Sequence, residues 1–221
     1  MNKDPNPSQN PDEIKVKFNQ AHFLLSVGRL EQLPDDSGIE VAFIGRSNAG
    51  KSSALNILTN QNGLAKVSKT PGRTQLINVF RINDQIRLID LPGYGYAKVP
   101  EKVKKDWMVL LDRYLRDRMC LQGLVIVMDI RHPLQDNDWE FLNWTEDCNI
   151  KTHILLTKAD KLSFGQRKTT LLNTLRKVKS FRNEVTAQIF SAHNREGLEE
   201  FQAKLTEWYL PALTDPEDHT N

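Results

Sequence analysis

The sequence predicts an α/β fold with three layers: a six-stranded, mostly parallel sheet with one antiparallel strand, and helices on both of its faces. Short apolar runs alternate with longer amphipathic segments along most of the chain, which is the order expected of such a fold. Runs such as 124–128 are continuously apolar, as expected of strands covered on both faces. The composition also suits a soluble globular domain, because 39% of the 221 residues are hydrophobic and 26% are charged.

The first half of the folded region predicts three strands and one helix. Residues 39–44 form an apolar run, and a helix is expected over 52–58, directly after a glycine-rich turn. Strands are expected over 75–81 and 86–90. The dipeptide Asn83-Asp84 between them favours a tight turn, so these two strands form the antiparallel hairpin of the sheet.

The second half alternates regularly between the two kinds of element. Strands are expected over 123–129, 152–156 and 185–190, and helices near 103–119, 136–146, 164–178 and 197–209.

Four segments are predicted along the chain. Residues 1–13 are polar and rich in Pro and Asn, which favours a disordered tail. Residues 14–38 form an N-terminal extension that can dock on the edge of the sheet, residues 39–210 form the main domain, and residues 211–221 form an acidic tail. No window approaches 18 uninterrupted apolar residues, so no membrane span is expected.

The turn after the first strand carries the strongest motif. It fits G-x-x-x-x-G-K-[ST] between a predicted strand and a predicted helix, the setting in which this pattern binds the phosphates of a nucleoside triphosphate. Its glycines let successive backbone N–H groups face phosphate oxygens, Lys51 reaches the β- and γ-phosphates, and the Ser52 hydroxyl ligates Mg²⁺. The motif consists of Gly45, Arg46, Ser47, Asn48, Ala49, Gly50, Lys51 and Ser52.

A second motif, Asp90-Leu91-Pro92-Gly93, ends the strand 86–90. The Asp90 carboxylate can hold the Mg²⁺ shell, and the Gly93 N–H can bond the γ-phosphate. Between Ser52 and Asp90, the loop 68–75 contains two threonines, one of which is expected to close over the γ-phosphate and supply a second hydroxyl to Mg²⁺. Thr74 is the candidate because it stands next to the predicted strand.

Two later strand ends favour guanine as the base. The run Thr157-Lys158-Ala159-Asp160 places a carboxylate where it can accept from both N1–H and the 2-amino group of guanine, while the Lys158 stem packs over the ring. Adenine lacks this donor pair, and an unpaired buried carboxylate is costly. The run Phe190-Ser191-Ala192 follows the last strand, where the Ala192 N–H can reach guanine O6.

Together the motifs GRSNAGKSS, TPGRTQ, DLPGYGYAKV, TKAD and FSA closely resemble the EngB (YihA/YsxC) family of bacterial Era-like translation-factor GTPases, over roughly residues 16–210. The resemblance implies a Ras-like G domain of the P-loop NTPase class that binds GTP or GDP through 45–52, 90–93, 157–160 and 190–192. It adds Gly72, Arg73, Thr74, Gln75 and Leu76 to the nucleotide site, and puts Mg²⁺ on Ser52 and Thr74. It also implies a monomeric cytoplasmic protein that acts in assembly of the large (50S) ribosomal subunit, in contact with ribosomal RNA, and in normal cell division and septation.

Hydrolysis requires a water in line with the γ-phosphate and positive charge near the leaving group. Where Ras-type proteins have a Gln after the D-x-x-G glycine, this chain has Tyr94, so slow intrinsic turnover is expected. The predicted catalytic residues are therefore Lys51, Thr74, Gly93 and Asn48. Asn48 resembles the phosphate-loop Asn that helps bind K⁺ in some relatives; the alternatives are that it only stabilises the loop, or that a ribosomal particle completes the site.

Basic residues concentrate in two places. The segment 161–182 carries seven basic residues and no acidic one, which suits either an RNA-facing surface or a solvated helix face. The helix near 103–119 combines basic residues with Trp107 and Tyr114. We expect these aromatic residues to pack inward and the lysines to favour RNA.

Two further function classes compete with the guanine switch. An ATP-dependent kinase or ATPase would share only the phosphate loop, and Asp160 argues against it. A non-catalytic scaffold that binds GDP or GTP is conceivable because of Tyr94. The two cysteines, Cys120 and Cys148, show no metal or redox spacing, which favours a reducing compartment.

Overall fold

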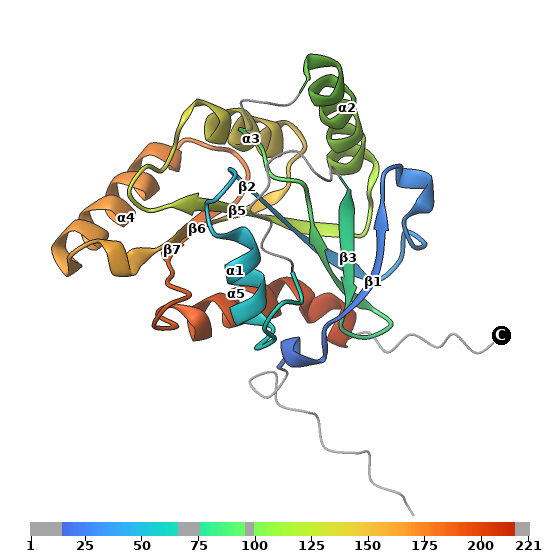
Figure 1. Cartoon of the computed structure of the whole chain (residues 1–221), viewed down its shortest axis with the longest axis horizontal. Coiled ribbons are helices and arrows are strands. Elements are labelled where there is room, and N and C mark those ends of the chain that lie inside the picture. Colours follow the sequence, from blue (N-terminus) through green and yellow to red (C-terminus); the bar gives the residue numbers. More distant parts are fainter. Residues whose placement is uncertain (1–14, 66–75, 96–99, 215–221) are drawn as a thin grey trace, which may run out of the picture.

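The computed structural model describes residues 15–65, 76–95 and 100–214. A single seven-stranded sheet, in the order β1-β3-β4-β2-β5-β6-β7, lies at its centre, with helices on both sides (Figure 1). Its strands are β1 (His22–Val27), β2 (Ile39–Gly45), β3 (Ile77–Arg81), β4 (Ile86–Asp90), β5 (Leu121–Asp129), β6 (Lys151–Thr157) and β7 (Val185–Ile189). The helices are α1 (Lys51–Leu58), α2 (Glu101–Asp117), α3 (Asp136–Asp147), α4 (Phe164–Val178) and α5 (Leu198–Thr214), with short 3-10 turns at Phe18–Gln20, Leu30–Gln32 and Ala159–Lys161.

The predicted α/β class, the mostly parallel sheet and its single antiparallel strand are confirmed. Strand β3 runs antiparallel to both of its neighbours, β1 and β4, while the pairs from β4 through β7 are parallel. Each helix and strand expected from the sequence is present, and 86–90 and 164–178 have the predicted bounds. Helix α5 is longer than the predicted segment 197–209 and continues through Pro211.

The sheet has seven strands rather than the predicted six, because β1 pairs with β3 at the edge. Sequence periodicity gives little sign of this strand. Only Val27 of its six residues is buried, so the alternation that normally marks a strand is nearly absent. Backbone pairing with β3, in a register that joins Ser26 to Asn78, holds the strand in place.

The core forms two layers, one on each face of the sheet. Alternate residues of β2 point to opposite faces, so Val41 and Phe43 pack on the side of α1 and α5, while Ala42 and Ile44 pack on the side of α2 and α3. Trp107 and Tyr114 of α2 are buried, as the inward-packing interpretation predicted. No helix in the described part of the chain is long and apolar enough to cross a membrane.

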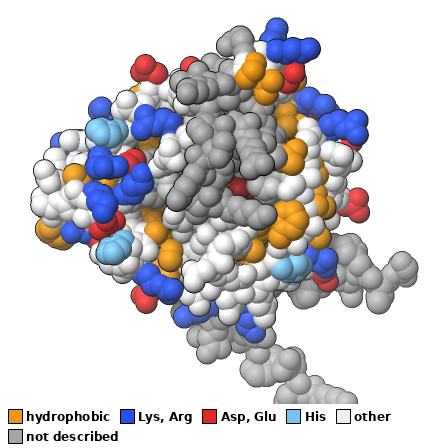
Figure 2. Space-filling view, in the orientation of Figure 1, with side chains coloured by type: hydrophobic (Ala, Val, Ile, Leu, Met, Phe, Trp, Pro, Cys, Tyr) orange, Lys and Arg blue, Asp and Glu red, His pale blue; other side chains and the backbone are white. Residues whose placement is uncertain are grey.

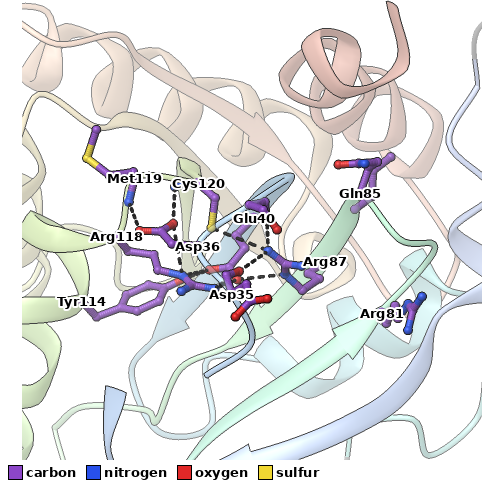
Figure 3. A network of polar contacts seen from close by, with 12 residues as sticks. Asp35, Asp36, Glu40, Arg81, Gln85, Arg87, Tyr114, Arg118, Met119 and Cys120 are labelled. Carbon is purple, nitrogen blue, oxygen red and sulfur yellow. Dashed lines mark hydrogen bonds and ion pairs between the residues drawn. The ribbon is translucent and has the colours of Figure 1, made fainter. Parts of the chain in front are cut away.

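A buried polar cluster lies at the amino end of β2 (Figure 3). The Glu40 carboxylate is fully buried and accepts from Arg87 Nε at 3.0 Å, from Arg118 Nη2 at 2.6 Å and from the Tyr114 hydroxyl at 3.0 Å. Cys120 borders this cluster, and burial raises its pKa to about 12, so its thiol is an unreactive neighbour. These contacts tie the end of α2 to the sheet.

Candidate guanine-nucleotide site

The phosphate-loop motif connects β2 to α1 at the carboxyl end of the parallel strands. Gly45 fits closely against β5, since a Cβ atom there would lie 2.6 Å from the Val127 carbonyl oxygen. Gly50 caps α1 with φ of 102°, a left-handed conformation that glycine adopts without strain, and no side chain caps the helix. The N-terminus of α1, where N–H groups and the helix dipole favour negative charge, therefore lies at a position suited to an anion.

Lys51 and Asp90 meet beside this loop. The Lys51 ammonium forms an ion pair with Asp90 Oδ1, and both side chains are largely buried. Ser52 lies in the first turn of α1 and lines the same pocket as Asp90. A hydroxyl and a carboxylate are hard oxygen ligands of the kind Mg²⁺ prefers. No cluster of three or more His, Cys, Asp or Glu residues that could hold a metal occurs among the described residues.

Tyr94 is fixed between the phosphate loop and α3. Its backbone N–H donates to the Gly45 carbonyl at 3.2 Å, and its carbonyl accepts from the Ser47 N–H at 2.9 Å. Its hydroxyl donates to Asp138 at 2.6 Å, and its ring stacks on Phe141 with centroids 4.4 Å apart. Burial, together with the Asp138 charge, raises the pKa of Tyr94 well above its usual value. Residues 96–99, which follow it, lie outside the described ranges.

The loop after β6 is joined to the phosphate loop by two side chains. Lys158 Nζ donates to the Asn48 carbonyl at 2.6 Å, and the Thr157 hydroxyl donates to the Ala49 carbonyl. Asn48 and Lys158 both have positive φ, 63° and 59°. These contacts place the predicted base-recognition residues next to the predicted phosphate cradle.

Asp129, at the end of β5, forms an ion pair with Lys158. Its carboxylate lies 3.0 Å from Lys158 Nζ and accepts from Arg131 Nε and Nη2 at 2.9 and 2.6 Å. Burial alone would raise the pKa of Asp129, but hydrogen bonds from Arg131 and Lys158 outweigh it and hold the pKa far below its usual range. No sequence motif pointed to this ion-pair chain.

Asp160 and Ser191 come together from neighbouring strand ends. The Ser191 hydroxyl donates to Asp160 Oδ1 at 2.7 Å, and Lys161 Nζ lies 3.1 Å from Oδ2. These contacts, the Ser191 hydrogen bond first, lower the pKa of Asp160, so its carboxylate stays charged at neutral pH. The Ala159 N–H donates to the Phe190 carbonyl at 3.2 Å, which joins the two predicted base-recognition loops, and Ala192 follows them, half-buried.

A pocket of about 850 Å³ lies over the phosphate loop and the ends of β2 and β4, and its lining does not include Asp160, Ser191 or Ala192. Of the predicted nucleotide-binding residues, it is lined by Gly45, Arg46, Ser47, Asn48, Gly50, Lys51, Ser52, Leu76, Asp90, Leu91, Pro92, Gly93 and Lys158. Gly72, Arg73, Thr74 and Gln75 lie outside the described residues. Two lining residues, Ser26 and Asn78, belong to no motif and were missed from the sequence. The volume of the pocket suits a small-molecule ligand.

Comparisons with known proteins identify the family of this chain. The sequence model of the family described as "50S ribosome-binding GTPase" matches residues 40–158. The "Probable GTP-binding protein EngB" of Coxiella burnetii (strain RSA 331) is 54% identical over 197 residues, 89% of this chain and 96% of that protein. A protein of the same description from Vibrio parahaemolyticus is 50% identical over 200 residues, 90% and 91% of the two chains.

Solved structures share the fold at low sequence identity. A crystal structure described as "a probable GTP-binding protein engB" superposes with a TM-score of 0.63 and 21% identity, over 78% of this chain and 99% of that one. Era in complex with MgGDPNP and a segment of 16S ribosomal RNA superposes with a TM-score of 0.59 and 20% identity, over 78% and 57%. From the family match and the close relatives together, the chain belongs to the EngB family of GTP-binding proteins and is a GTPase.

Proposed function

We propose that this GTPase is a slow molecular switch that binds GTP and GDP with Mg²⁺ and acts in assembly of the large ribosomal subunit, and through it in normal cell division and septation. The observation that carries the proposal is the joining of two loops: Lys158 and Thr157 hold the base-recognition loop against the carbonyls of Asn48 and Ala49 in the phosphate loop. The loop that carries Asp160, the carboxylate expected to select guanine, is thereby held next to the phosphate cradle.

Different residues bind different parts of the nucleotide. The phosphate loop and the start of α1 bind the phosphates, and Lys51 exchanges its partner Asp90 for the β- and γ-phosphates. Ser52, Thr74 and, through water, Asp90 would hold Mg²⁺, which supplies positive charge to the phosphates. Asp160, kept charged by Ser191, accepts from guanine, and Lys158 covers the ring.

Slow turnover follows from the position of Tyr94. Its side chain is buried and its hydroxyl is committed to Asp138, so it cannot orient a water at the γ-phosphate as a glutamine would. Asn48 is the candidate for completing the site with K⁺: its side chain is exposed and makes no hydrogen bond to another described residue, while its backbone carbonyl accepts from Lys158. Equal hydrolysis rates in K⁺ and Na⁺ buffers would reject the K⁺ role and leave completion to the ribosomal particle.

RNA contact is proposed for the basic segment 161–182, which includes α4. Lys and Arg side chains gather on the side of the molecule where α4 lies (Figures 1 and 2). Three of the seven cations have carboxylate partners, since Lys161, Arg167 and Arg182 pair with Asp160, Glu196 and Glu146. No ion pair joins the other four to a carboxylate of the described residues, which leaves net positive charge for phosphates: Lys168, Arg176, Lys177 and Lys179.

The test is co-sedimentation with ribosomal subunits in the presence of GDP or a non-hydrolysable GTP analogue. We expect the chain to travel with 50S particles in the analogue and to be released in GDP. The Lys51→Ala variant, which cannot hold the triphosphate, is the matched control and should remain unbound in both. Binding that ignores the nucleotide would contradict the switch.

A further inference from the structure

Three polar side chains from three neighbouring strands form a row across the floor of the pocket. Ser26 of β1 stands opposite Asn78 of β3, and Asn78 stands opposite Asp90 of β4, in the register of the two strand pairs. The Ser26 hydroxyl donates to Asn78 Oδ1 at 2.6 Å, and Asn78 Nδ2 donates to Asp90 Oδ2 at 3.2 Å. All three line the pocket that holds Lys51 and Ser52.

The hydrogen bonds of the row run in one direction, from Ser26 to Asn78 and from Asn78 to Asp90. An ionised carboxylate only accepts, so the Asn78 amide must turn its NH₂ group toward Asp90 and its oxygen toward β1. Ser26 supplies a donor to that oxygen and so stabilises this orientation. The opposite orientation would set the amide oxygen against the carboxylate and leave the NH₂ group to face Ser26.

The row also divides the two oxygens of Asp90. Asn78 engages Oδ2, while Lys51 pairs with Oδ1 on the side of the phosphate loop. The carboxylate is thereby held in one orientation from both sides. When Lys51 turns to phosphate, the Asn78 contact remains and holds Oδ2, which leaves Oδ1 on the side of the phosphate loop.

We propose that Asn78 is a positioning residue for the Mg²⁺ carboxylate Asp90, and that Ser26 sets the orientation of Asn78. The inference rests on the proposed binding of Mg²⁺ with guanine nucleotide and deepens it. It makes β1, which lies outside the family match over 40–158, part of the metal-supporting machinery. A strand position favours β-branched or aromatic residues and disfavours Asn, so the amide at 78 is not explained by strand formation.

The test measures release of a fluorescent GDP analogue from the full chain, with Mg²⁺ and with excess EDTA. The ratio of the two release rates gives the factor by which Mg²⁺ retains the nucleotide. We expect Asn78→Leu to lower this factor about tenfold, because it removes a hydrogen bond to a charged group. The release rate in EDTA should stay within about twofold of the wild type, because the phosphate and base contacts are untouched.

The Ser26 variants test the order of the row. Ser26→Ala should lower the Mg²⁺ factor by about twofold to threefold, since it removes one neutral, exposed hydrogen bond. In the Asn78→Leu background the same change should have no further effect. Ser180→Ala and Asn173→Leu, exposed positions in and after α4, are the matched controls and should behave as the wild type.

An unchanged Mg²⁺ factor in Asn78→Leu would overturn the inference. If release accelerated equally with Mg²⁺ and with EDTA, the factor would be unchanged and Asn78 would be a support of the pocket only. Should Asn78→Leu fail to fold, Asn78→Val, which suits a strand and has no donor, carries the same expectation. A wild-type chain that binds no guanine nucleotide, or whose release ignores Mg²⁺, would instead reject the proposed function.

Discussion

The two ends of β2 carry different polar clusters. At its start, the Glu40 carboxylate is enclosed by Arg87, Arg118 and Tyr114. At its end, the strand leads into the phosphate loop, where Lys51 forms an ion pair with Asp90. Both clusters are polar and both are tied to strands of one sheet. Glu40 is fully buried, and its two oxygens have four donors among their described neighbours. The phosphate-loop end instead leaves N–H groups and an ammonium facing a pocket of about 850 Å³.

The difference separates a structural cluster from a ligand site. A buried charge with all of its partners in place has nothing left to offer a ligand, and losing one partner leaves an uncompensated charge. A site for an anion needs donors that can exchange their present partners for the ligand. Neighbouring contacts must keep these donors in place. Lys51 has such an exchangeable partner, and Tyr94, Thr157 and Lys158 are the fixed neighbours.

The largest effect is expected at the ligand end. Lys51→Ala removes the ammonium that reaches the β- and γ-phosphates, so GTP binding should be lost, by on the order of a hundredfold or more. Folding should be affected less than by loss of the fully buried Glu40, because Asp90 lines the pocket and keeps the Asn78 contact. Calorimetric titration with GTP and a urea melt on the same sample would show both. A fall in the free energy of unfolding as large as the loss in the free energy of GTP binding would contradict the contrast between the two ends of β2.

The reverse pattern is expected at the other end. Glu40→Ala removes the counter-charge of buried Arg87 and leaves Arg118 with only Asp36 among the described carboxylates, at 3.7 Å, which should lower the free energy of unfolding by about 3–5 kcal/mol. GTP affinity of the molecules that remain folded should change little, because the pocket lies at the far end of β2. Glu31→Ala is the control: Glu31 pairs with Arg113 on the exposed surface, and its loss should leave the free energy of unfolding nearly unchanged.

A second buried polar group gives the comparison a pH dependence. The ring nitrogens of His153, in β6, form hydrogen bonds with Thr186 and Gln188, and the ring stacks on Phe201. Burial lowers the pKa of His153 from 6.5 to about 4. The folded state therefore excludes a proton that the unfolded state binds below pH 6.5, so this stability is present above pH 6.5 and is lost as the pH falls toward 4.

Urea unfolding at pH 7.5 and 5.5 would measure this loss. The wild type should lose about 1 kcal/mol more than His153→Gln across that interval, because the variant lacks the titrating ring. Equal losses in the two proteins would show that His153 is protonated as readily in the folded chain as in the unfolded one.

A smaller effect is expected for Asp129, which holds Lys158. Asp129→Asn keeps the shape of the side chain but weakens the grip on the ammonium, so affinity for GDP and for GTP should fall by about tenfold or less, by the same factor. In a Lys158→Ala background, Asp129→Asn should add nothing. Additive losses in the double variant would mean that Asp129 acts on the nucleotide by another route.

The sequence predicted those parts of the site that lie within single motifs. Lys51, Asp90, Asp160 and Ser191 each end or follow a strand at a recognisable spacing, and the sheet brings them to one edge. Ser26 and Asn78 could not be found this way, because their meeting with Asp90 depends on the register of three strands that are separated along the chain. Strand β1 was missed as a strand for the same reason: cross-strand pairing, not its own apolar pattern, defines it.

Selection of guanine by Asp160 is the central claim, and exchange of one atom tests it. In Asp160→Asn the amide can donate to the 2-oxo group of xanthine, while it lacks the second acceptor that guanine requires. Competition between GTP and xanthosine triphosphate, measured on wild type and variant, should show wild type preferring GTP and the variant preferring xanthosine triphosphate. A variant that still prefers GTP would contradict the account.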